Sequence, residues 1–258
     1  MRLQCRLLLT LSLITSFSWA ADDPFIGKWK VNPAESKLTD EMKVELAGEN
    51  RYAITFGPGA VDTITADGSD QPGLRGTTLS VAVEGPKTWR VVRKREGRML
   101  ISATWTLSED GKTLTDDFTG YGSDGSKHTV GYVYERTAGS SGFTGTWDSV
   151  GAKVDSSIQL DIKPWEGDGL SLAIPGAQIS KSLRFDGRDY PDGARASDGA
   201  ACSGRRLNER TLEITNKRDG RITDTWQIGL SGDGRILTLT MRPERQSTPQ
   251  NILVFDRE

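Results

Sequence analysis

The chain is poor in the residues that build soft-metal sites and nucleophilic triads. Its 258 residues include one histidine, His128, and two cysteines, Cys5 and Cys202. Zinc and copper sites need more donors than these. A triad built on His128 would need an orienting acid, and none stands beside it in the sequence, so a residue at the start of a surface strand is the better interpretation. We expect no metal, no cofactor and no catalytic set.

Long apolar runs are also missing, except at the start of the chain. Arg2 and Arg6 flank an apolar stretch, Leu7–Phe17, which ends in small residues suited to a cleavage site. This pattern predicts a signal peptide over residues 1–20 and hence a secreted, most simply periplasmic, protein. The stretch is too short to span a bilayer, and no later run is long enough, so we expect a soluble mature chain with no membrane span.

Positive charge is not in excess either. Lys and Arg number 33 against 35 Asp and Glu, and loss of the signal peptide would make the chain more acidic. A clustered basic face is the usual requirement for nucleic acid, so we expect no such partner. Cys5 would leave with the signal peptide, so no internal disulfide is expected. Cys202 would then be a half-buried bystander, or alternatively a reactive or intermolecular thiol. The oligomeric state stays open.

Glycine, by contrast, is abundant, with 29 residues, and nine of them directly follow an aspartate. Asp-Gly suits the positive φ angles of tight hairpin turns. Between these pairs apolar residues alternate, as in Met42/Val44/Leu46 and Met99/Ile101/Ala103, which is typical of strands with one buried face. No segment keeps a helical period for three turns. The sequence therefore predicts an all-β, antiparallel protein.

The alternating pattern occurs twice. Phe25-Ile26-Gly27-Lys28-Trp29 and Phe143-Thr144-Gly145-Thr146-Trp147 both read F-x-G-x-W, and the segments after them align at offsets of 116 to 123 residues. This repeat predicts two homologous units, 21–137 and 143–258, joined by a flexible linker over 138–142. Each unit offers about eight strands joined by hairpins. Two tandem up-and-down β-barrels are expected, since closure leaves no open edge, with a two-sheet sandwich as the alternative.

The F-x-G-x-W opener resembles the Gly-x-Trp of lipocalins and their calycin relatives. In that family the tryptophan plugs the closed end of the barrel under a basic residue from the last strand. The resemblance implies that Trp29 lies beneath Arg136, and Trp147 beneath Arg257, through cation–π contacts. Asn32-Pro33-Ala34-Glu35-Ser36 also resembles the uncharacterised lipocalin-like domains that occur singly or in tandem in secreted bacterial proteins.

The resemblance covers both units but is weaker in the second. That unit lacks Asn-Pro-Ala-x-Ser and has Val150-Gly151-Ala152-Lys153-Val154 nearby. The family implies a barrel and the binding of a small apolar ligand or a partner, without identifying the ligand.

Two acids stand at positions whose side chains should point into a barrel. Asp116 shares a face with Leu114 and Phe118, and Asp224 shares one with Trp226. A carboxylate inside a barrel is costly unless it is paired or hydrated, so each marks either a ligand contact or a rim or bulge position. Inward aromatic residues either line a pocket or fill a small barrel. Our candidate ligand-contact residues are Trp89, Trp105, Asp116, Tyr132, Asp224 and Trp226.

Two further patterns have an ordinary interpretation beside a functional one. Acids recur at matching turns, Asp67/Asp70 and Asp186/Asp189, where calcium is one interpretation and self-capping of the turn is the other. The basic run from Arg90 to Arg98 could hold an anion or could be a solvated strand face.

Three functions are consistent with these patterns. A non-catalytic binding protein for a small apolar or amphipathic ligand is the hypothesis we favour. The alternatives are an envelope scaffold or inhibitor that acts through its outer surface, and a barrel hydrolase or isomerase that uses an inward aspartate as general base.

Overall fold

The computed structural model describes residues 23–57, 61–122, 124–177, 179–193, 196, 199–244 and 251–258. The predicted signal peptide over 1–20 lies outside these residues. Strands dominate the described chain, with short 3₁₀ turns at Leu74–Gly76 and Pro175–Ala177, so the all-β prediction is confirmed. In this part of the chain, no helix is long and apolar enough to cross a membrane.

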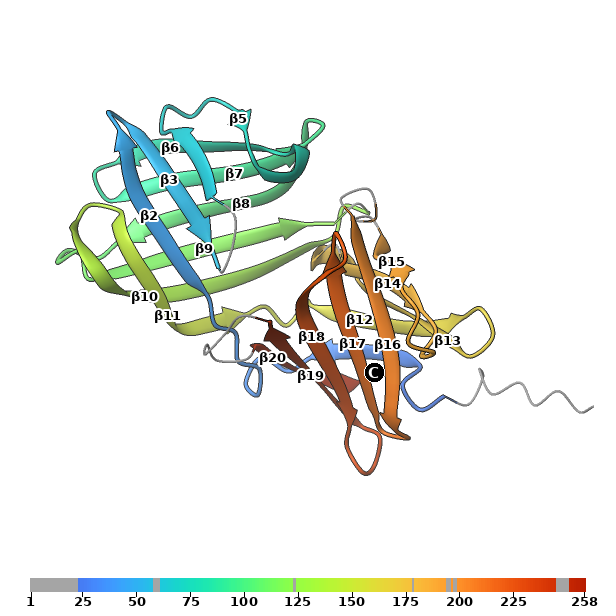
Figure 1. Cartoon of the computed structure of the whole chain (residues 1–258). Helices are drawn as coiled ribbons and strands as arrows, with labels where there is room; N and C mark the ends of the chain where they lie inside the picture. Colours follow the sequence, from blue (N-terminus) through green and yellow to red (C-terminus); the bar gives the residue numbers. More distant parts are fainter. Residues whose placement is uncertain are drawn as a thin grey trace, which may run out of the picture.

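The strands form two antiparallel, nearly closed barrels of ten strands each (Figure 1), rather than about eight. Barrel 1 has the order β4-β3-β2-β11-β10-β9-β8-β7-β6-β5, in which the first and last strands along the chain pair with each other. Its strands are β2 (Glu41–Gly48), β3 (Arg51–Phe56), β4 (Val61–Thr65), β5 (Gln71–Pro72), β6 (Thr78–Gly85), β7 (Thr88–Arg95), β8 (Arg98–Leu107), β9 (Thr113–Tyr121), β10 (Lys127–Ser141) and β11 (Thr144–Val154).

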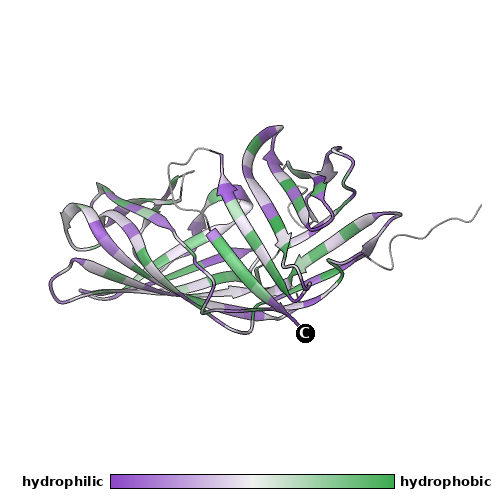
Figure 2. Ribbon diagram, turned by 90° about the horizontal axis from the view of Figure 1, so that it is seen from below, coloured by the Kyte–Doolittle hydropathy of each residue, from purple (hydrophilic) through white to green (hydrophobic). Residues whose placement is uncertain are grey.

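Barrel 2 has the order β14-β13-β12-β1-β20-β19-β18-β17-β16-β15. Its strands are β1 (Gly27–Val31), β12 (Gln159–Trp165), β13 (Gly169–Ile174), β14 (Ile179–Leu183), β15 (Tyr190–Pro191), β16 (Ala200–Asn208), β17 (Thr211–Arg218), β18 (Arg221–Leu230), β19 (Ile236–Pro243) and β20 (Asn251–Arg257). Hydrophobic and hydrophilic residues alternate along many strands of both barrels (Figure 2). This is the period-two pattern from which the strands were predicted.

The two barrels have exchanged their opening strands. β1 lies between β12 and β20 in barrel 2, and β11 lies between β2 and β10 in barrel 1. In Figure 1 the blue N-terminal strand accordingly lies with the yellow to red strands of barrel 2. The predicted boundaries 21–137 and 143–258 are therefore wrong for the folded units. Barrel 1 is the continuous stretch 41–154, inserted between β1 and the rest of barrel 2. Because the two openers share one sequence pattern, each fits the same place in either barrel.

The predicted linker over 138–142 is wrong for the same reason. Residues up to Ser141 belong to β10, which turns tightly into β11 with Ser141 opposite Thr144. The chain instead crosses between the barrels at residues 32–40 and 155–158. The small residues over 138–142 therefore belong to the end of β10 and the β10–β11 hairpin turn, and they do not form a flexible connection.

The Asn-Pro-Ala-x-Ser segment holds the first crossing against β20. The Ser36 hydroxyl donates to the Asn32 carbonyl (2.8 Å) and accepts from the Val254 amide (3.0 Å). Lys37 and Ile252 exchange backbone hydrogen bonds of 2.7 Å. The second unit needs no such segment, because β11 stays paired with β10 as far as Val154.

Replacing Ser36 by alanine should remove both hydroxyl bonds and leave the Val254 amide unsatisfied. We expect a loss of about 1–2 kcal/mol in the free energy of unfolding, measured by urea denaturation. Ser156→Ala in the other crossing, where the side chain is exposed, is the control and should change stability by less than about 0.5 kcal/mol. Equal effects of the two variants would contradict this role.

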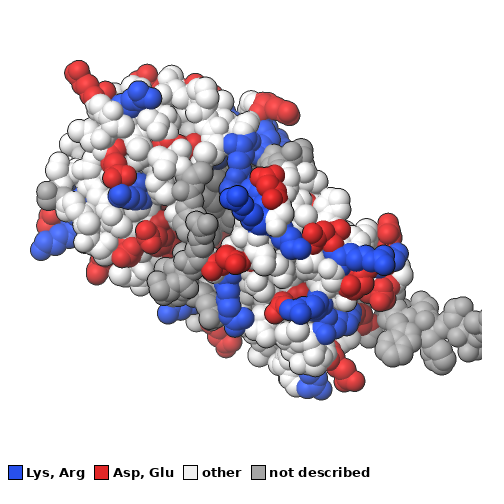
Figure 3. Space-filling model, in the orientation of Figure 1, with Lys and Arg blue, Asp and Glu red and all other residues white. Residues whose placement is uncertain are grey.

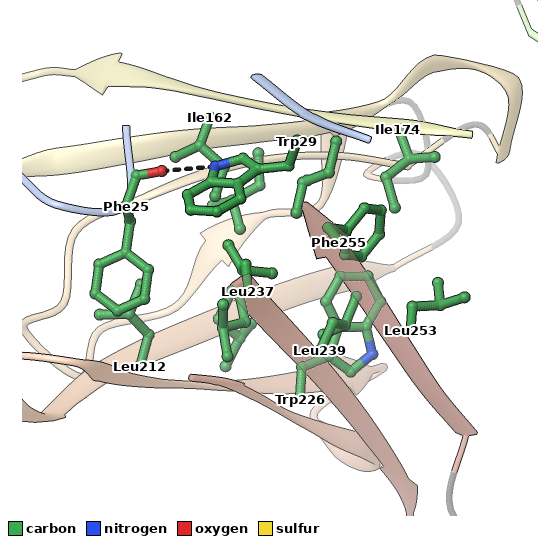
Figure 4. Packing of buried hydrophobic residues seen from close by; sticks show 14 of the residues in the cluster. Phe25, Trp29, Ile162, Ile174, Leu212, Trp226, Leu237, Leu239, Leu253 and Phe255 are labelled. Carbon is green, nitrogen blue, oxygen red and sulfur yellow. Dashed lines mark hydrogen bonds between the residues drawn. The ribbon is translucent and has the colours of Figure 1, made fainter. Parts of the chain in front are cut away.

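Each barrel is closed at one end by its F-x-G-x-W tryptophan. Trp29 and Trp147 are fully buried, and their indole N–H groups donate to the carbonyls of Phe25 (3.0 Å; Figure 4) and Phe143 (2.9 Å). The guanidinium of Arg257 lies 4.1 Å from the ring centre of Trp29, and that of Arg136 lies 4.1 Å from Trp147.

An arginine does lie over each tryptophan ring, but the two arginines are exchanged relative to the prediction. Trp29 does not meet Arg136, nor Trp147 Arg257, because each tryptophan travels with its exchanged strand. Arg257 also donates to the carbonyls of Ile26 (2.9 Å) and Gly234 (2.8 Å), which ties β1 to the base of barrel 2.

Candidate ligand-binding site

Barrel 1 contains a cavity of about 580 Å³. It lies away from the Trp147 seal, toward the end of the barrel that carries the β7–β8 turn. Thr39 of the first crossing and Asn251 of β20 complete its wall, and the Thr39 amide donates to the Asn251 side-chain oxygen (2.6 Å). Barrel 2 therefore contributes directly to this site. The other lining residues are Asp40, Phe56, Leu74, Arg75, Thr77, Leu79, Val91, Arg93, Arg95, Leu100, Ile101, Ala103, Trp105, Asp116, Phe118 and Tyr132.

Three predicted contact residues meet in one row of this cavity. Asp116 on β9 stands directly opposite Trp105 on β8 and Tyr132 on β10 in the strand register. Ala103, two residues before Trp105 on the same face, leaves space above the row because its side chain is small. The alternation of β8, β9 and β10 thus places an acid, an indole and a phenol at the base of an otherwise largely apolar chamber.

Asp116 is the electrostatic centre of the site. Its side chain is only 7% exposed, and burial raises its pKa to about 7. The nearby indole N–H of Trp105 lowers that pKa, although the two groups do not meet the geometry of a full hydrogen bond, and the charges of Asp40 and Asp117 raise it. An unfolded aspartate has a pKa near 4, so ionisation of Asp116 opposes folding. The empty barrel should lose stability as the pH rises from about 4 to about 7.

A second acid, Asp40, lies just before β2. Burial raises its pKa, while the hydrogen bond from the Tyr134 hydroxyl (2.9 Å) opposes that rise. Burial and the two acids also raise the pKa values of Tyr132 and Tyr134, so both phenols stay protonated at neutral pH. Asp40 was missed from the sequence, although its spacing from Met42 and Val44 places it on the same inward face.

A buried ion pair forms the wall near the mouth. Arg93 meets Asp62 at 2.5 Å and donates to the Thr77 hydroxyl (2.9 Å), and the other Asp62 oxygen accepts from the Leu74 amide (2.8 Å). Arg93 belongs to the predicted basic run but points inward. Its charge is therefore committed to Asp62 and the loop after β5.

Barrel 2 has bulkier or apolar side chains where barrel 1 has its cavity. In the strand register, Leu239 and Leu253 replace Asp116 and Tyr132, and Trp226 replaces Ala103. Both leucines are buried in a cluster with Trp29, Trp226 and Phe255 (Figure 4). The same fold can thus be filled by leucine at the positions where barrel 1 keeps an acid and a phenol.

Inward polar side chains of barrel 2 pair with one another. Lys181, fully buried, pairs with Asp192 (2.8 Å) and lies 4.8 Å from the ring centre of Trp226. Asn216 donates to Asp224 at 2.5 Å. Asp224 and Trp226 are therefore held in this cluster and do not join the cavity of barrel 1. Lys181 was also missed, although it alternates with inward Ile179 and Leu183.

Trp89 lies outside the cavity, near the sealed end of barrel 1. It stacks on Phe143 at 4.2 Å between ring centres and meets the edge of Tyr52 at 4.8 Å. It does not line the cavity, because the exchanged strand brings Phe143 over it.

Two single residues also differ from expectation. His128 is buried against Phe118, with ring centres 5.5 Å apart, and is not a surface residue. Cys202 is fully buried in the core of barrel 2, not half-buried, and forms no disulfide.

The repeated acids act in the turns. Asp67 accepts from the amide and hydroxyl of Ser69 (2.9 and 2.6 Å), and Asp70 pairs with Lys94 (2.8 Å). Asp186 accepts from Tyr190, and Asp189 pairs with Lys217 (2.6 Å). Among the described residues, no group of three His, Cys, Asp or Glu side chains is placed to hold a metal ion.

Basic side chains gather where barrel 1 meets barrel 2 on the face shown in Figure 3. Arg75 and Arg95 line the cavity of barrel 1, and Arg95 donates to the Arg75 carbonyl (3.3 Å).

Comparison of the chain with known protein families, curated proteins and solved structures finds no match in any of the three.

Proposed function

We propose that the protein is a secreted, periplasmic binding protein, built from lipocalin-like barrels, that holds a small apolar or amphipathic ligand in barrel 1 without catalysing a reaction. The observation that supports this most is the cavity itself. Its volume of about 580 Å³ is in the range of small-molecule sites, and its largely apolar wall with a few converging polar groups is typical of them. Barrel 2 would support the site through Asn251.

The cavity favours this function over an envelope scaffold that acts through its outer surface. Two solidly packed barrels would suit a scaffold, whereas an internal chamber in a small barrel costs packing energy. We infer that this cost is retained for a ligand.

A proton-transfer enzyme is the second candidate, because Asp116 lies in a cavity with a pKa near 7. Such a value suits a general base at neutral pH. The two functions differ in a measurable way, since the enzyme must turn over a bound compound and the binding protein must release it unchanged. Native mass spectrometry of the protein purified from its own host, followed by analysis of the released molecule, distinguishes them.

Filling the cavity should weaken binding. In Ala103→Leu the larger side chain occupies space beside Trp105, and we expect at least a tenfold loss of affinity for any ligand found in a tryptophan-fluorescence titration against lipids and haem. Ala53→Leu is the matched control, since Ala53 alternates with inward Ile54 and faces outward on β3. Equal binding by the two variants, or no response to any compound, would count against a ligand in this cavity.

A further inference from the structure

The base of the cavity contains two buried polar atoms without hydrogen-bond partners. They are Oδ1 of Asp116, 7% exposed, and the indole nitrogen of Trp105, 1% exposed. Buried polar atoms in native proteins are nearly always hydrogen-bonded, so unpaired ones need an explanation. Here both atoms belong to residues that line the same chamber.

The fold itself does not require an acid at this place. Leu239 occupies the equivalent position in barrel 2, where it is buried among other apolar side chains. An aspartate with an unpaired oxygen destabilises an empty barrel relative to that leucine. A partner that arrives with the ligand would remove the cost.

The charges around Asp116 favour a cationic partner. Asp40 shares the cavity wall and Asp117 lies on the same strand, and the charges of both raise the pKa of Asp116. Tyr132 and Tyr134 are neutral, and the wall cation, Arg93, is held by Asp62. Arg75 and Arg95 stand near the mouth, where solvent screens their charge. Among the residues that the structure describes, no cation therefore acts on the acid at the base.

We infer that the ligand of barrel 1 is an amphipathic amine whose ammonium group binds the carboxylate of Asp116 at the base of the cavity. Its apolar body would lie along Phe56, Leu79, Val91 and Phe118. An ammonium hydrogen-bonded to a buried carboxylate forms a strong, charge-assisted contact. A carboxylate ligand would instead meet two acids. This inference rests on the proposed function and adds the chemical class of the ligand.

Binding should depend on pH in a defined direction. An alkylammonium keeps its charge between pH 5 and pH 8, whereas Asp116, with a pKa of about 7, is mostly protonated at pH 5 and mostly ionised at pH 8. A proton must leave Asp116 before the ion pair forms. Affinity for an amine should therefore rise from pH 5 to pH 8, and ligands without a charge should show no such rise.

The test uses three probes of equal chain length, decylamine, decanol and decanoate, titrated into the full-length protein by calorimetry at pH 5 and pH 8. At pH 8 we expect decylamine to bind at least tenfold more tightly than the other two, and its affinity to fall at least tenfold at pH 5. Asp116→Asn should abolish this preference and leave decanol binding unchanged. Asp117→Asn makes the same change at the adjacent exposed position, whose charge acts on Asp116 less than that of Asp40 does. It is the control and should keep the preference.

The outcomes separate the two claims. Tight binding of decanol or decanoate without a preference for the amine would overturn the inference and leave the binding function standing. An amine preference that survives in Asp116→Asn would also overturn it. Failure of all three probes to bind would count against both. If Asp116→Asn does not fold, the pH profile of the unmodified protein decides, since the inference requires decylamine affinity to increase with pH.

Discussion

Trp147→Ala should destabilise barrel 1 by about 3–5 kcal/mol and abolish ligand binding at elevated temperature or mild denaturant, although Trp147 belongs to the second sequence repeat. The indole is fully buried between β2 and β10, opposite Met42 and Arg136. Its removal leaves a cavity, an Arg136 without its aromatic partner and the Phe143 carbonyl without its donor. A whole domain is typically stable by only 5–15 kcal/mol, so this loss is a large fraction.

Trp29→Ala is the matched control, because it removes the same interactions from the other barrel. We expect a similar cost, located in barrel 2, with the cavity of barrel 1 still able to bind. Hydrogen–deuterium exchange locates each effect: amides of β2–β11 should lose protection in Trp147→Ala, and amides of β12–β20 in Trp29→Ala. The opposite pattern would show that the strands are not exchanged in solution.

Much of the architecture could be predicted from the sequence, since it depends on local rules. Alternation locates strands, and Asp-Gly marks hairpin tips such as Asp219-Gly220, where both residues have positive φ angles. The exchange could not be predicted, because the openers at Trp29 and Trp147 present the same pattern to either barrel. The one relevant difference was Asn-Pro-Ala-x-Ser, present only after the first opener. The sequence does not indicate that this segment crosses between the barrels, because that role depends on its hydrogen bonds to β20.

The candidate site could be predicted only in part: which side chains point inward was predictable, but their position along the barrel axis was not. The alternation of inward and outward side chains was enough to place Asp116, Trp105 and Tyr132 inside barrel 1, because all three lie in regular strands. It failed for Trp89, which also points inward but lies near the sealed end. Position along the barrel axis depends on the strand register and on which strand completes the wall.

The exchange of opening strands also explains why Asn251 of barrel 2 completes the wall of the cavity in barrel 1. Since β1 ends in barrel 2 and β2 begins in barrel 1, the crossing carries Asp40 to the cavity and places Thr39 against Asn251. If each opening strand paired within its own sequence repeat, β1 and β2 would lie in the same barrel and residues 32–40 would not need to cross between barrels. The arrangement therefore links the position of an inward acid to the packing of β20.

Fragments provide the second large test of the exchange. Residues 39–157 contain β2–β11, and every strand pair of barrel 1 lies within this continuous range. We expect this fragment to fold alone, with cooperative urea unfolding, and to bind the same ligand within about tenfold of the full chain, since it lacks only Asn251 from the cavity wall.

The control fragment, residues 39–142, ends at the boundary that the repeat would suggest and lacks β11. Removing β11 leaves the edges of β2 and β10 unpaired and removes Trp147 from the sealed end. We expect no cooperative transition from this fragment, and aggregation during refolding. A stable, ligand-binding 39–142 would show that β11 is dispensable to barrel 1. Collapse of 39–157 beside a folded 21–137 would mean that barrel 1 uses its own opener, β1, because β1 is the only F-x-G-x-W strand that 21–137 contains.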